Sequence, residues 1–259
     1  MGIVNVTPDS FSDGGHFFEA EAAIGHGLRL AGEGADILDV GGESTRPGAD
    51  PVTVGEELRR VLAVVEALSA SGHRVSVDTM KLEVARATLE AGATAVNDVS
   101  AFRFAPELAG LVADRGADCC LMHMLGEPRT MQADPRYDDV VSDVRAFLEE
   151  RLAFAVAEGV PEERVWLDPG IGFGKTVEHN LELLRRLDEI AAIGRPVVIG
   201  TSRKSFLAKV SGDSGGDDRL PGTIATSVLA LERGASIFRV HDVAPVAAAL
   251  KVAAATVAP

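Results

Sequence analysis

The chain has little of what marks secreted, membrane-spanning or nucleic-acid-binding proteins. It contains two cysteines, Cys119 and Cys120, which are adjacent and therefore too constrained to form an ordinary structural disulfide. No run of about 18 apolar residues is present to cross a membrane. Met1 leads straight into strand-like sequence, so no signal peptide is expected. These absences favour a cytoplasmic protein in which both cysteines are small buried hydrophobic residues.

Basic residues are also scarce in this sequence. There are 25 Lys and Arg residues against 39 Asp and Glu, which gives a net charge of −14. Phosphate backbones select basic faces, so this balance argues against a nucleic-acid partner. If the ligand is an anionic small molecule, a local basic cluster must act against the global field.

The length and the apolar content set the scale of the fold. Of the 259 residues 46% are hydrophobic, enough for a sizeable core, and 27 glycines with 12 prolines fit many short loops. The chain suits one large α/β barrel or two small domains. Because no internal repeat or interdomain linker is seen, we expect a single domain over residues 1–259, with a surface insertion at 211–218.

Strand patterns alternate with helix patterns along the whole chain. The predicted strands are 2–6, 35–40, 74–77, 95–97, 118–122, 165–167, 196–199 and 236–240. The predicted helices include 19–34, 81–91, 106–115, 138–158, 177–193, 204–210, 221–233 and 243–257. Eight strand–helix units of this size predict an α/β fold, the (β/α)8 TIM barrel. A doubly wound open sheet is the alternative, but no G-x-G-x-x-G motif follows an early strand.

Polar or charged side chains stand at all eight predicted strand ends. Because a barrel carries its active site at the carboxyl ends of its strands, these residues are expected to converge. Helix capping explains single residues of this kind, but Lys204, Arg239 and His241 precede no helix that they could cap. The sequence therefore predicts a polar pocket inside the barrel mouth.

The predicted pocket has two chemical characters. Asp78, Asn97 and Asp168 offer acceptors and an amide, which suit the edge of a nitrogen heterocycle. Donors and positive charges suited to phosphate oxygens come from Asn5, Arg46, Arg203, Lys204, Arg239 and His241. For Arg46 and Arg203 a surface salt bridge is an equal alternative, and His123 also fits a satisfied core histidine.

The segment 165–176, VWLDPGIGFGKT, joins the sixth predicted strand to a helix. Three glycines follow Asp168, and glycine lets a backbone pass closely at angles that a β-carbon forbids. A strand-to-helix turn with a capping aspartate is the alternative. The ending GKT resembles a P-loop, but Pro169 stands where the first glycine is required and offers no N–H to a phosphate.

Motifs along essentially the whole chain resemble the dihydropteroate synthase family. They are NVTPDSFSDGG (5–15), DVGGESTRPGA (39–49), VSVDT (75–79), NDVS (97–100), MHMLGEPRTMQ (122–132), LDPGIGFGKT (167–176), TSRKSF (201–206) and RVHDV (239–243). The resemblance implies condensation of 6-hydroxymethyl-7,8-dihydropterin pyrophosphate with p-aminobenzoate, which releases pyrophosphate and forms dihydropteroate. It also implies Mg²⁺ as cofactor and a homodimer.

The resemblance assigns roles to individual residues. The pterin would contact Asp78, Asn97, Asp168 and Lys204. The pyrophosphate would contact Asn5, Thr45, Arg239 and His241, with Asn5 also at Mg²⁺. The aminobenzoate would lie against Phe11, Arg46, Pro47, Phe173 and Ser205. Catalysis would depend on Asp78, Lys204 and Asp9, the acids stabilising a pterin cation that forms as pyrophosphate leaves.

Two related functions remain open from the sequence. A pterin-binding methyltransferase barrel would share the pterin acids but lack the Arg239–His241 pair and Lys204. A non-catalytic paralogue would bind pterin without turnover, and the presence of every expected ligand argues against it.

Overall fold

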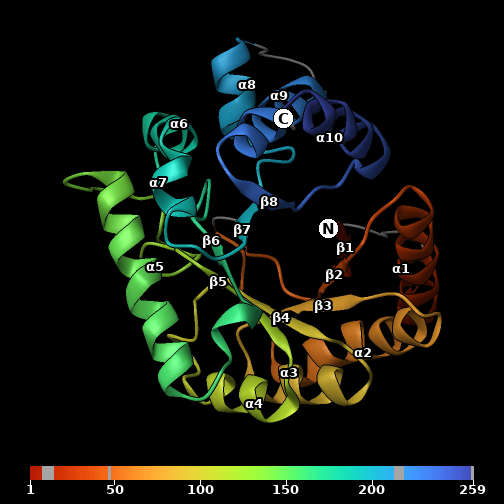
Figure 1. Cartoon of the computed structure of the whole chain (residues 1–259). Helices are drawn as coiled ribbons and strands as arrows, with labels where there is room; N and C mark the ends of the chain where they lie inside the picture. The colour runs from red at the N-terminus through yellow and green to blue at the C-terminus, as the bar shows by residue number, and fades with distance from the viewer. Residues whose placement is uncertain (8–14, 46–47, 213–218, 258–259) are drawn as a thin grey trace.

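The computed structural model describes residues 1–7, 15–45, 48–212 and 219–257 and shows the predicted barrel (Figure 1). Its strands are β1 (Gly2–Asn5), β2 (Leu38–Gly41), β3 (Val75–Asp78), β4 (Ala95–Asp98), β5 (Asp118–Met122), β6 (Val165–Asp168), β7 (Val197–Ile199) and β8 (Ala235–Phe238). All pair in parallel, in the order β1 to β8. A bridge between Gly2 and Val240 joins the first strand to the end of the last and closes the ring.

Helices surround the strands on the outside of the ring (Figure 1). They are α1 (Gly15–Gly32), α2 (Val54–Ala70), α3 (Leu82–Glu90), α4 (Glu107–Arg115), α5 (Val140–Ala157), α6 (Val177–Arg185), α7 (Leu187–Ala191), α8 (Ser205–Ser211), α9 (Leu220–Glu232) and α10 (Val243–Val257), with a short 3-10 helix at Glu162–Arg164. No helix in the described ranges is long and apolar enough to span a membrane.

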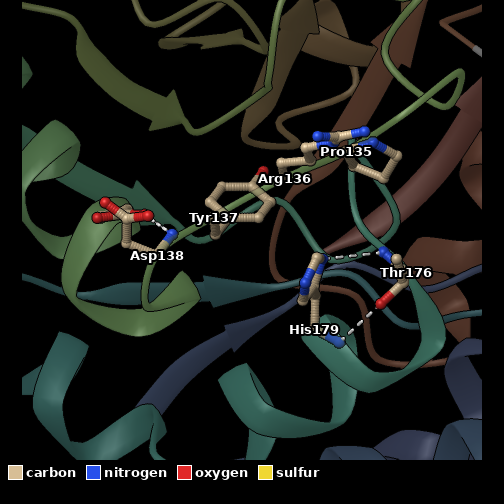
Figure 2. A pocket seen from close by; sticks show the side chains of 7 residues that line it. Pro135, Arg136, Tyr137, Asp138, Thr176 and His179 are labelled. Atoms are coloured by element: carbon tan, nitrogen blue, oxygen red, sulfur yellow. Dashed lines mark hydrogen bonds between the residues drawn. The ribbon is translucent and has the colours of Figure 1, made fainter.

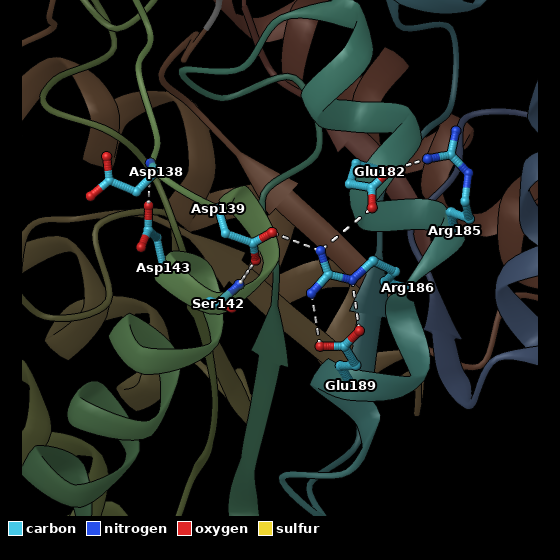
Figure 3. A network of polar contacts seen from close by, with 8 residues as sticks. All are labelled: Asp138, Asp139, Ser142, Asp143, Glu182, Arg185, Arg186 and Glu189. Atoms are coloured by element: carbon cyan, nitrogen blue, oxygen red, sulfur yellow. Dashed lines mark hydrogen bonds and ion pairs between the residues drawn. The ribbon is translucent and has the colours of Figure 1, made fainter.

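The predicted helix 177–193 is wrong in one respect, because the structure divides it into α6 and α7 at Arg186. Arg186 leaves the helical conformation, with φ −111° and ψ 31°. Its guanidinium donates to Asp139 at 2.8 Å and to both carboxylate oxygens of Glu189 at 2.7 and 3.0 Å (Figure 3). These contacts tie the break to the start of α5, and periodicity along 177–193 alone carries no sign of them.

Apolar side chains of the described residues form three clusters, of which the smallest holds Val99 and three methionines after β4 and around the loop after β5. The largest cluster lies between the strands and the helices, and the remaining one fills the inside of the barrel with Ile37, Ala95, Cys120, Trp166 and Val198. Both cysteines are buried and unpaired, as predicted.

The alternation of strand side chains places the polar residues next to this inner apolar cluster, on the side of the carboxyl ends of the strands. Residues two apart on one strand face the same side, so Asn97 follows Ala95 and Asp168 follows Trp166 toward the carboxyl end. Asp78 lies in register with Asn97 on the neighbouring strand. The fold therefore brings Asp78 and Asn97 side by side at the carboxyl end of the barrel, and Asp168 lies at the same end, on β6.

Candidate active site

A cluster of two carboxylates, an amide and a guanidinium lies inside the barrel. Arg239, just after β8, donates from Nε to Asp39 Oδ2 at 2.6 Å and from Nη2 to Asp78 Oδ2 at 2.7 Å. Asn97 donates from Nδ2 to the same Asp39 oxygen at 3.0 Å. Two of the predicted ligands, Arg239 and Asn97, thus meet at Asp39, a residue that the sequence reasoning did not select, and Arg239 links Asp39 to Asp78.

The charges of this cluster perturb one another. Burial raises the pKa of Asp78 to about 7; the Asp39 carboxylate adds to the effect and Arg239 opposes it. Burial works against the charge of Arg239, but Asp39 and Asp78 outweigh it and raise the pKa of the guanidinium. Arg239 therefore stays charged, and in this structure it faces carboxylates of the predicted pterin site.

Asp168 and Lys204 form the other side of the predicted pterin site. Asp168 accepts a hydrogen bond from the Gly170 N–H at 2.7 Å, and burial raises its pKa while Lys204 lowers it. Lys204 donates to the Ile171 carbonyl, and its Nζ lies 4.8 Å from the ring centroid of Phe173. Burial lowers the pKa of Lys204 to about 8 against the attraction of Asp168.

The glycines after Asp168 allow a close approach between two loops. Gly170 has φ +67°, and a Cβ there would lie 1.9 Å from the carbonyl oxygen of His123. Gly174 has φ +64°, and its Cβ would meet that of Leu125 at 2.5 Å. The segment 169–176 between β6 and α6, called the glycine loop below, thus packs against the loop after β5. Only glycine fits at positions 170 and 174.

A second buried lysine, Lys175, holds the glycine loop from behind. Its Nζ lies 2.9 Å from His123 Nδ1 and donates to the Phe173 carbonyl at 3.0 Å. Burial lowers the pKa of Lys175, and burial together with Lys175 lowers the pKa of His123 to about 2. His123 is a neutral, bonded core histidine, and the P-loop-like lysine points into the protein.

The phosphate-side residues take different positions. Ser202 Oγ lies 3.0 Å from His241 Nδ1 and accepts the His241 backbone N–H at 3.1 Å. Arg203 forms a surface salt bridge with Asp242 at 2.5 Å, which is the alternative to phosphate binding that the sequence left open. Asn5 ends β1 and is half-buried.

The remaining predicted ligands are only partly described. Thr45 is half-buried in the loop after β2, Phe173 is half-buried, and Ser205 is exposed at the start of α8. Asp9, Phe11, Arg46 and Pro47 lie outside the described residues.

An ion-paired network anchors the base of the loop after β2. Lys81 donates to Glu43 at 2.8 Å and to Glu57 at 2.5 Å, and Glu43 accepts the Val52 N–H at 2.9 Å. Arg60 donates to the Gly42 carbonyl at 2.8 Å. These bonds fix where the loop that carries Thr45 begins and ends.

A surface hollow of about 610 Å³ lies on the outer side of the glycine loop (Figure 2). It is lined by Pro135, Arg136, Tyr137, Asp138, Asp143, Thr176 and His179. Tyr137 donates to the Gly174 carbonyl at 2.7 Å, so one wall supports the loop. None of the predicted ligands that the structure describes lines this hollow, and the barrel interior remains the candidate active site.

Acids, an amide and cations that converge inside the carboxyl end of a (β/α)8 barrel define a barrel enzyme for a small hydrogen-bonding substrate. Over residues 1–241 the sequence matches the family described as pterin binding enzyme. It is 45% identical to the dihydropteroate synthase of Escherichia coli (strain K12), with 99% of this chain and 90% of the relative covered. The chain belongs to the dihydropteroate synthase family and is a transferase.

Solved structures agree with this assignment. The dihydropteroate synthase of Xanthomonas albilineans with 4-aminobenzoic acid has a TM-score of 0.93 and 49% identity, covering 100% of this chain and 93% of that one. The enzyme from the same organism in complex with 7,8-dihydropteroate has a TM-score of 0.89 and 46% identity, covering 100% and 94%. A probable bifunctional folylpolyglutamate synthase/dihydropteroate synthase of Haloferax volcanii is 46% identical, and this chain spans 30% of its length.

Proposed function

We propose that the chain condenses 6-hydroxymethyl-7,8-dihydropterin pyrophosphate with p-aminobenzoate to give 7,8-dihydropteroate and pyrophosphate. The observation that carries the proposal is the convergence of Asp78, Asn97, Asp168 and Lys204 around Arg239 at the carboxyl end of the barrel. A pterin ring has N–H and carbonyl groups along its edges, and these four side chains offer matching acceptors and donors. Structures of related synthases with 4-aminobenzoic acid and with 7,8-dihydropteroate support the choice of substrates.

The reaction is proposed to begin with loss of pyrophosphate. The bond from the exocyclic carbon to the pyrophosphate oxygen breaks, the electron pair leaves with the pyrophosphate, and a pterin cation remains. Asp78 and Asp168 would stabilise that cation electrostatically. The amine nitrogen of p-aminobenzoate then bonds to the exocyclic carbon and loses a proton, so no protein nucleophile is required.

Pyrophosphate binding is assigned to Asn5, Thr45, Arg239 and His241. Within the described ranges no group of three or more His, Cys, Asp or Glu side chains could hold a metal. Asn5 fits Mg²⁺ as a single oxygen ligand, because this ion keeps several waters and shares phosphate oxygens. Bound there, it would supply positive charge that neutralises the leaving pyrophosphate. His241, positioned by Ser202, would donate to the same anion.

The aminobenzoate is proposed to lie against Phe173 and Ser205, with Phe11, Arg46 and Pro47 completing the site and Asp9 aiding catalysis. Lys204 would connect the two substrates, because its ammonium lies over the Phe173 ring and is attracted by Asp168. This position makes Lys204 the most informative residue to change.

Assembly and location are proposed from the surface and the cysteines. Val210, Leu229 and Val252 on α8, α9 and α10 are exposed, Val252 by 67%. A second copy of the chain would cover this face, and light scattering of a Val252→Asp variant tests the homodimer. We propose a cytoplasmic, single-domain protein; the two buried free cysteines support the cytoplasmic location.

The deciding experiment measures pyrophosphate release from the dihydropterin pyrophosphate with Mg²⁺, with and without p-aminobenzoate. Release that rises with p-aminobenzoate and yields dihydropteroate is expected. The Lys204→Ala variant should lose it, whereas Lys209→Ala, which removes an exposed lysine of the same segment, should not. Pterin binding with no release under any condition would leave only a binding protein.

A further inference from the structure

One oxygen of Asp39 is left without a partner in the middle of the site. The side chain is completely buried, and its Oδ2 accepts hydrogen bonds from both Arg239 and Asn97. Its Oδ1 is buried and has no hydrogen-bond partner within the described part of the chain. An unpaired buried carboxylate oxygen is costly, so its persistence points to a donor that reaches it in another state of the protein.

The donor is already next to it. Arg239 presents Nε and Nη2 along one edge of its guanidinium, and this edge commonly pairs with both oxygens of a single carboxylate. Here the edge is divided, with Nε on Asp39 and Nη2 on Asp78. The division leaves Asp39 Oδ1 empty and occupies Oδ2 of Asp78, one of the two oxygens to which the N–H groups of a pterin would donate.

We propose that Asp39 is a positioning residue that takes over Arg239 when a pterin ring binds to Asp78. The Nη2–H leaves Asp78 Oδ2 and donates to Asp39 Oδ1, while Nε stays on Asp39 Oδ2. This inference rests on the proposed function, because it requires that Asp78 binds the ring. The exchange keeps every N–H and both carboxylates paired, and it holds the guanidinium beside the ring.

An asparagine at position 39 would block the exchange. Its amide has one oxygen, which can keep a bond to Arg239 Nε, but its NH₂ group cannot accept the second N–H. Arg239 would then remain on Asp78 and compete with the ligand. We expect Asp39→Asn to weaken pterin binding about tenfold, a size common for residues in direct contact.

The test uses 6-hydroxymethylpterin, a probe without phosphates, and titration calorimetry on the full chain. Asp39→Asn, Arg239→Gln and the double variant form a double-mutant cycle. The Asp39→Asn change is expected to weaken binding about tenfold with Arg239 present and less than twofold in the Arg239→Gln background. Ser76→Ala is the matched control, because Ser76 is the buried register partner of Asp39 and makes no bond to Arg239; it should bind like wild type.

Several outcomes would overturn the inference. An equal loss in both backgrounds would mean that Asp39 acts without Arg239, and unchanged binding in Asp39→Asn would remove the role altogether. If wild type does not bind the probe, the proposed function and this inference both fail. If wild type binds the probe but the effects of the two substitutions simply add, only this inference fails.

A second measurement needs no variant and stays informative if Asp39→Asn does not fold. In a crystal structure of wild type with the probe, Arg239 Nη2 should lie within hydrogen-bond distance of Asp39 Oδ1. A guanidinium that remains on Asp78 Oδ2 beside the bound ring would overturn the exchange.

Discussion

Replacement of Gly170 by alanine tests whether the glycine loop is shaped by contact with the loop after β5. Gly170 has φ +67°, and an alanine Cβ would lie 1.9 Å from the His123 carbonyl oxygen. The left-handed backbone costs an L-residue about 1–2 kcal/mol. Displacing a backbone carbonyl adds an overpacking cost of about 1–3 kcal/mol. We therefore expect Gly170→Ala to lower the free energy of unfolding by about 2–5 kcal/mol, the sum of these two effects.

Gly126 provides a matched control for this substitution. It has nearly the same φ, +68°, but a Cβ there would meet nothing within 4 Å. Gly126→Ala should therefore show only the backbone cost of about 1–2 kcal/mol. Urea unfolding of both variants measures the difference, and steady-state kinetics should show that Gly170→Ala also loses kcat/KM, because Gly170 donates to Asp168. Equal destabilisation by the two substitutions would refute the close-approach explanation.

Three further predictions follow from the site. Because the folded protein holds a proton on Asp78 up to about pH 7, its stability should fall as pH rises from about 4 to about 7, and urea unfolding of Asp78→Asn should show a flatter slope; an unchanged slope would contradict the raised pKa. Lys175→Met removes the donor to the Phe173 carbonyl, so it should raise KM for p-aminobenzoate more than KM for the pterin substrate; an equal rise would refute a role through Phe173. Chelation of Mg²⁺ should weaken pyrophosphate binding in wild type but hardly in Asn5→Ala, as calorimetry would show, and equal losses would move the metal away from Asn5.

The fold was predictable because its signals are local and repeated. Each strand is short and apolar, each is followed by an amphipathic or capped helix, and eight such units close only as a barrel. The position of the predicted ligands at strand ends was predictable for the same reason. Asp78, Asn97 and Asp168 each end or nearly end a strand, so the parallel sheet carries all three at the same end of the barrel, with Asp78 and Asn97 in direct register.

The two residues that the sequence reasoning missed are hidden for physical reasons. Asp39 lies inside the buried β2, where both faces are covered and no alternation of apolar and polar residues marks the inward side. Lys175 follows a glycine and precedes a threonine, so its pattern resembles a phosphate loop, whereas its burial beside His123 depends on a residue 52 positions away in sequence. Both roles arise from contacts between distant segments, which periodicity and spacing do not encode.

The charges inside the barrel explain how an acidic protein can serve this reaction. Asp39, Asp78 and Asp168 face Arg239 and Lys204, and these five side chains, when all are ionised, carry one excess negative charge. That excess opposes the pyrophosphate but favours a ring that becomes cationic as the pyrophosphate leaves. A shift of Arg239 from Asp78 to Asp39 leaves the total unchanged and exposes Asp78 to the ring. The Asp78 carboxylate would therefore become available to attract the cation only after the pterin has bound.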